Sequence, residues 1–185
     1  MPECQPVQMS QRTGVVPSLT LNDLPQATEH LAFEVVYFRL LSDEQFVKTI
    51  PNYGIVQAVG YAQLIHFRVL LAFFYPGKTY DDDCTVNDFM RLLDEFDKRF
   101  PIAMRTNPAW TKAMKTALNK RLAHFSSARW LDHPTPDWSM YRGPMKELDA
   151  VIHAFHIALP DSLRQIFERR IRHWETWSFG SNQRS

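Results

Sequence analysis

Prolines divide this chain of 185 residues into blocks, and within each block apolar residues recur at intervals of three and four. That interval is the period of an α-helix with one buried face, and a proline interrupts such a helix because it lacks a backbone N–H. The blocks predict helices over residues 24–46, 53–75, 86–100, 108–130, 144–159 and 160–177. The sequence therefore predicts an all-α fold, a single-domain bundle of five to six helices.

The two ends of the chain lack this period. Residues 1–22 mix Pro, Gln, Ser and Thr and predict a flexible N-terminal arm, residues 23–178 form the single helical domain, and residues 179–185 are expected to be a disordered tail. The N-terminus has no basic segment followed by an apolar run, so we expect no secretory signal. The longest strongly apolar run, residues 69–75, is shorter than the roughly 20 residues of a membrane-spanning helix. We therefore expect a cytoplasmic protein with no membrane segment.

Charge and cysteine content exclude several classes of protein. The formal net charge is +1, which argues against a globally basic nucleic-acid binder. Cys4 and Cys84 are the two cysteines, too few for a disulfide framework or a cysteine zinc site. Both are expected to be free thiols.

Charge is strongly segregated between residues 80–97 and 98–131. The first segment is acidic, and the second has no Asp or Glu but eight basic residues, which are Lys98, Arg99, Arg105, Lys112, Lys115, Lys120, Arg121 and Arg129. A basic helix of this kind can present a phosphate-binding face, with Lys115, Lys120 and Arg129 as its contacts. Alternatively, the acidic third helix and the basic fourth helix neutralise each other as an antiparallel pair, which is the interpretation that we favour.

The fourth predicted helix also places Arg121 and His124 on one face with three small residues, Ala113, Ala117 and Ala128. Along the chain these five residues follow steps of four, four, three and four. A guanidinium and an imidazole at a close helix crossing need partners or an open cleft. Together they have the chemistry to cleave a phosphodiester, since His transfers protons and Arg offsets phosphate charge. The alternative is a histidine that is hydrogen-bonded within the core.

On the second predicted helix, Arg68 is surrounded by apolar residues and His66 lies on the main apolar stripe. A helix that is apolar nearly all round is expected to be central in the bundle. We therefore expect Arg68 to form a buried structural ion pair. The candidate carboxylates are Glu34, Asp82, Asp83 and Asp88.

Three histidines lie in the last two helices, and His153 and His156 are close to one turn apart. With His173 they offer a remote metal site, but no acidic residue completes a known ligand pattern. We expect no metal site and no cofactor.

Two segments resemble a known superfamily. The run HFRVLLAFF at residues 66–74, an Asp-rich turn, and NKRLAH at residues 119–124 with Arg129 beyond it are similar to a group of uncharacterised bacterial helical proteins. That group in turn resembles the HEPN superfamily of helical bundles, many of which are dimeric ribonucleases in toxin and defence systems. The superfamily motif is Arg, four to six residues, then His. Here His124 occupies the His position, Asn119 stands five residues before it and Arg121 three before it.

The resemblance implies a metal-independent ribonuclease with a degenerate motif. Its catalytic residues would be His124, Arg121 and Asn119, and its partners RNA or a nucleotide and a second copy of the chain. The alternative function is a non-catalytic helical module for protein–protein interaction, in which the polar residues only fasten the helices together.

Overall fold

The structure, a computed structural model, describes residues 19–42, 47–77, 83–119, 122 and 139–180, with side chains described as far as residue 173. Every regular element within these ranges is a helix, which confirms the all-α class. Residues 19–23 are described and include a short 3-10 helix, η1 (Leu21–Asp23). Residues 1–18 of the predicted arm lie outside the described residues, so its flexibility stays a prediction. The last helix extends to Gly180, two residues beyond the predicted domain boundary.

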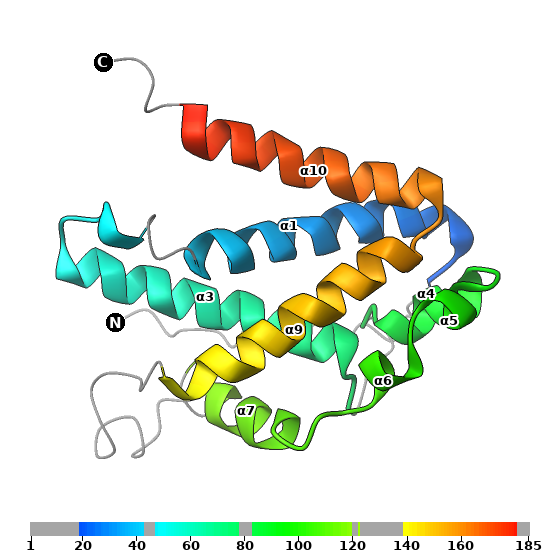
Figure 1. Cartoon of the computed structure of the whole chain (residues 1–185), viewed down its shortest axis with the longest axis horizontal. Coiled ribbons are helices and arrows are strands. Elements are labelled where there is room, and N and C mark those ends of the chain that lie inside the picture. The colour runs from blue at the N-terminus through cyan, green and yellow to red at the C-terminus, as the bar shows by residue number, and fades with distance from the viewer. Residues whose placement is uncertain (1–18, 43–46, 78–82, 120–121, 123–138, 181–185) are drawn as a thin grey trace, which may run out of the picture.

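Four long helices form the frame of the bundle (Figure 1). α1 (Leu24–Ser42) lies between α10 (Asp161–Gly180) and α3 (Tyr53–Phe74) and packs against both. α9 (Ser139–Ala158) crosses α3 and leads through Pro160 into α10. In this arrangement α1 is covered on two sides, and α3 lies at the edge of the molecule.

Four short helices are described between α3 and α9 in the chain. They are α4 (Val86–Leu92), α5 (Phe96–Arg99), α6 (Ile102–Arg105) and α7 (Thr111–Leu118). The single helix predicted over residues 86–100 is wrong, because Glu95 takes a left-handed backbone conformation with φ 61° and separates α4 from α5. This break and the short α6 bring the number of helices in the described ranges above the five to six expected.

Two other helix boundaries differ from the prediction. Of the helix predicted over residues 108–130, the described residues are 108–119 and 122. α7 begins only at Thr111, and Asn119 and Leu122 have π-helical geometry. α9 begins at Ser139, not at Pro144, which lies in the second turn of the helix. A proline there removes one backbone hydrogen bond without ending the helix, so it is a poor marker of the start.

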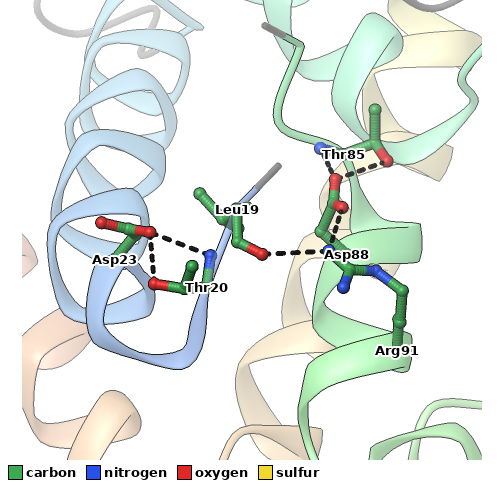
Figure 2. Close-up of polar contacts among 6 residues, drawn as sticks. All are labelled: Leu19, Thr20, Asp23, Thr85, Asp88 and Arg91. Atoms are coloured by element: carbon green, nitrogen blue, oxygen red, sulfur yellow. Dashed lines mark hydrogen bonds and ion pairs between the residues drawn. The ribbon is translucent and has the colours of Figure 1, made fainter. Parts of the chain in front are cut away.

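Side-chain caps fix the starts of two helical segments (Figure 2). Asp23 accepts hydrogen bonds from the backbone N–H and the hydroxyl of Thr20, at 2.9 and 2.6 Å, and these bonds lower the pKa of its carboxyl. Asp88 accepts in the same way from Thr85 at the start of α4, at 3.0 and 3.2 Å. Both arrangements are capping boxes, in which a threonine and the carboxylate three residues later satisfy each other's backbone N–H groups.

Arg91 connects the two caps. Its guanidinium donates to Asp88 at 3.1 Å and to the backbone carbonyl of Leu19 at 3.0 Å (Figure 2). The residues that precede α1 are thereby hydrogen-bonded to α4.

Aromatic residues dominate the core. Phe155 of α9 is fully buried, and six other phenylalanine rings surround it with centroid distances of 5.2 to 6.4 Å. The six are Phe73, Phe74, Phe89, Phe96, Phe100 and Phe167. Most of these pairs meet edge to face, the arrangement that aromatic quadrupoles favour.

One helix among the described residues, α3, is long and apolar enough by length and composition to cross a membrane. The expectation from residues 69–75 considered only an unbroken apolar run and missed this helix. Only 28% of its most apolar window is buried within the molecule, although helices of this composition also occur in soluble cores.

Candidate functional site

The site predicted on the fourth helix falls mostly outside the described residues. Lys120, Arg121, His124 and Arg129 are among those not described, and Asn119 is exposed at the end of α7. The structure therefore does not test whether Asn119, Arg121 and His124 meet. The catalytic assignment stays a prediction from the sequence.

Lys115 is described, and in the structure it contacts the end of α3. It is half-buried, and its ammonium donates a hydrogen bond to the backbone carbonyl of Tyr75, the residue that ends α3. Burial lowers the pKa of Lys115 below its usual value. The ammonium thus satisfies an orphan carbonyl at a helix C-terminus, and the assignment of Lys115 as phosphate-binding stays a prediction from the sequence.

Arg68 is exposed, and it forms no ion pair within the described part of the chain. The buried ion pair predicted for it is wrong, because α3 is covered on one side only. Glu34 pairs with His66 instead, and Asp88 pairs with Arg91. Asp82 lies outside the described residues.

His66 and Glu34 form a polar link between α3 and α1. Glu34 Oε2 lies 2.7 Å from His66 Nδ1, and the ring of Tyr37 stacks on the imidazole with centroids 5.1 Å apart. A carboxylate on Nδ1 orients a histidine as in general-base catalysis. Here Tyr37 covers one ring face, and Phe33 approaches its edge at 6.4 Å. The link therefore fastens the two helices beside the open face of α3.

The histidines of the last two helices serve separate contacts. His156 Nε2 lies 3.1 Å from Glu168 Oε1, and its ring stacks on Phe167 at 5.3 Å, which joins α9 to α10. His153 is exposed. Across the described ranges, no three His, Cys, Asp or Glu side chains are grouped so that they could hold a metal ion.

Two ion pairs in and beside α4 and α5 join residues close together in sequence. Asp88 pairs with Arg91 at 3.1 Å, and Glu95 pairs with Lys98 at 3.1 Å. We favoured ion pairing between the acidic third helix and the basic fourth helix of the prediction. Among the described residues, no ion pair joins residues 86–100 to residues 108–130.

The open face of α3 is a regular apolar stripe. Its six positions, which we call the α3 seam, are Ile55, Ala58, Ala62, Ile65, Val69 and Ala72. They follow steps of three, four, three, four and three, the spacing of the a and d positions of a heptad. Ile55, Ile65 and Val69 are 52, 50 and 42% exposed, and Ala58 and Ala72 are also exposed. The seam runs the length of the helix.

The opposite face of α3 is the one that the core uses. Leu64, Phe67, Leu70, Leu71 and Phe74 are all buried there. Arg68 is the only Asp, Glu, Lys or Arg residue in the 22-residue helix, so little charge interrupts the seam. Contiguous exposed apolar surface of this kind marks an interaction site in soluble proteins.

No protein-family model, no curated protein and no solved structure matches the chain. The resemblance to the HEPN superfamily accordingly remains a prediction that rests on residues 66–74 and 119–124. Function must therefore be argued from the chemistry of the surface itself. The heptad spacing was readable in the sequence, but the apolar residues on the other sides of α3 concealed which stripe would be exposed.

Proposed function

We propose that this protein is a helical interaction module that forms a homodimer through the α3 seam, with two copies of α3 packed antiparallel. The observation that carries the proposal is the order of large and small residues along the seam. From its start to its end the order is Ile, Ala, Ala, Ile, Val, Ala.

A two-fold axis between residues 63 and 64 pairs each seam position with another one on the second copy. Position 55 then faces 72, position 58 faces 69, and position 62 faces 65. Each layer combines an a position with a d position, as in antiparallel coiled coils, and each layer places one branched side chain against one alanine. Large residues facing small ones let two surfaces interdigitate at native packing density. The seam is therefore complementary to itself, as an isologous interface requires.

The flanks of the seam are compatible with this arrangement. In the antiparallel pair, Arg68 of one copy lies close to Tyr61 of the other, where a guanidinium can rest on an aromatic ring. With no second charged residue on α3, no like charges oppose each other near the axis. Arg68 has no ion pair within the described part of its own chain. The pairing gives it a contact with Tyr61 of the second copy.

The proposal treats the chain as a soluble cytoplasmic protein. One side of α3 packs against α1, α7 and α9, which suits a core helix at a subunit boundary. Self-association also agrees with the predicted resemblance, since HEPN active sites form at dimer interfaces. Incubating total RNA with the wild type and with His124→Ala tests that further step.

The test is the molar mass in solution, measured by light scattering or sedimentation over a range of concentrations. The wild type should reach the mass of a dimer, and Ile65→Lys should remain a monomer because it places a charge in the central layer. Ile157→Lys is the matched control, since Ile157 is 55% exposed on α9 and lies outside the seam. It should dimerise like the wild type. A wild type that stays monomeric at every concentration would overturn the proposal.

Cysteine cross-linking tests the antiparallel orientation, in a chain whose Cys4 and Cys84 are replaced by serine. A mixture of the Ala58→Cys and Val69→Cys proteins should yield a disulfide between the two variants, because these positions face each other. Ala58→Cys by itself should yield little, since its two copies lie far apart along the axis. Efficient cross-linking of Ala58→Cys by itself would instead indicate a parallel pair and contradict the layer assignment.

A further inference from the structure

A cavity of about 730 Å³ opens between the C-terminal half of α1, the N-terminal half of α3 and the N-terminal half of α9. Its volume lies within the range of roughly 300 to 1,000 Å³ that is usual for small-molecule sites. None of the described residues that line it belongs to the α3 seam.

The floor of the cavity is apolar. It is lined by Phe38, Leu41, Val56, Val59, Tyr141 and Met145. The ring of Phe38 is already stacked on Phe67 with centroids 6.0 Å apart, so its face is used within the core. Such a floor suits an aliphatic body better than a nucleobase, which needs an open aromatic face on which to stack.

The rim of the cavity is cationic. Arg39, Lys48, Arg142 and Lys146 line it, and among the described lining residues Asp149 is the one carboxylate. Arg39 already neutralises that carboxylate, because its Nε lies 2.7 Å from Asp149 Oδ1. Arg142 and Lys146 therefore supply the positive charge on which the binding of an anion at this rim depends.

Arg142 and Lys146 stand four residues apart on α9, and both are exposed. Like charges at this spacing on a helix repel each other. Neither side chain takes part in an ion pair recorded for the described residues. An anion held between them would remove the repulsion and gain charge-assisted hydrogen bonds.

We infer that this cavity binds an amphipathic anion, an acyl carboxylate, with its tail on the apolar floor and its carboxylate between Arg142 and Lys146. The buried amide of Gln63 closes the cavity from the α3 side, where its Nε2 donates to Ser42 Oγ at 2.6 Å. The carboxylate therefore lies beside the positive charges at the solvent-exposed edge of the cavity, and the tail lies in its interior.

Calorimetric titration with decanoate tests the inference on the full chain. Decanoate should bind saturably, with one site per chain, and the double variant Arg142→Gln/Lys146→Gln should weaken it by about tenfold or more, the equivalent of one strong charged contact. Decanol, which has the same tail without the charge, should bind equally to the wild type and to this variant. The matched control is Arg99→Gln/Lys112→Gln, which removes the same two charges at exposed positions away from the cavity.

Two results would overturn the inference. One is the absence of saturable decanoate binding by the wild type. The other is an equal loss of affinity in the control, which would show general attraction of anions. Circular dichroism of each variant confirms that it is folded. Molar mass measured on the same samples reports separately on the dimer, so this inference and the proposed function can fail independently.

Discussion

Phe155→Ala removes the ring on which six other phenylalanines converge. Phe155 is 0% exposed, and its neighbours belong to α3, α4, α5 and α10 or follow α5 directly. Truncation leaves a space that none of these helices can fill without moving, because each is held by its own further contacts. The variant therefore tests whether one aromatic cluster supports the whole fold.

The expected cost follows from this burial. Core Phe→Ala substitutions lose about 3 to 5 kcal/mol through lost transfer free energy and the cavity that remains. Because Phe155 has no exposed surface and six ring contacts, we expect a loss of stability at the upper end of this range, about 4 to 5 kcal/mol. For a protein of this length, each kcal/mol corresponds to roughly 2 to 4 °C in Tm, so the Tm should fall by about 8 to 20 °C.

Urea unfolding followed by circular dichroism measures this change. Ile157→Ala is the matched control, because Ile157 lies two residues further along the same helix and is 55% exposed. A surface substitution of that kind should change the free energy of unfolding by no more than about 0.5 kcal/mol. A loss below about 1 kcal/mol for Phe155→Ala, or a loss equal to that of the control, would refute the central role of the cluster.

Two further outcomes follow from α4 and the residues before it. Thr85→Ala should lower the free energy of unfolding by about 1 kcal/mol, measured by the same urea titration, since it removes the hydroxyl that donates to Asp88 at the start of α4. Burial, with a smaller contribution from Asp88, raises the pKa of the Cys84 thiol to about 11, so in a Cys4→Ser chain its alkylation at neutral pH should be slow. The rate should increase with pH towards that value, and fast alkylation of the folded protein at neutral pH would contradict the assignment.

Much of the frame was predictable from period and proline alone. α1 begins at Leu24 and α3 at Tyr53, where the sequence places them, because Asn52 caps α3 and its side chain accepts from the backbone N–H of Gly54 at 2.8 Å. A helix cap of this kind involves only residues close together in sequence, so it can be predicted without knowledge of the rest of the fold.

The exposure of α3 was not predictable in the same way. A helix with apolar residues nearly all round predicts a central position, yet the covered side is chosen by the neighbours that pack against it. Arg68 was assigned a buried partner for this reason, and it is exposed. The Glu34–His66 link was missed because it joins two helices across 32 positions of sequence. The predicted residues Arg121 and His124 lie outside the described ranges, so the sequence remains their only basis.

Glu95 restricts how this chain can change by mutation. Among the described non-glycine residues it alone has a positive φ. A left-handed conformation costs ordinary residues about 1 kcal/mol, and glycine avoids that cost. Glycine, asparagine and aspartate are therefore acceptable substitutes at this position, whereas valine or isoleucine is not. A side chain that is itself exposed thus has a short list of tolerated replacements, and the restriction comes entirely from the backbone.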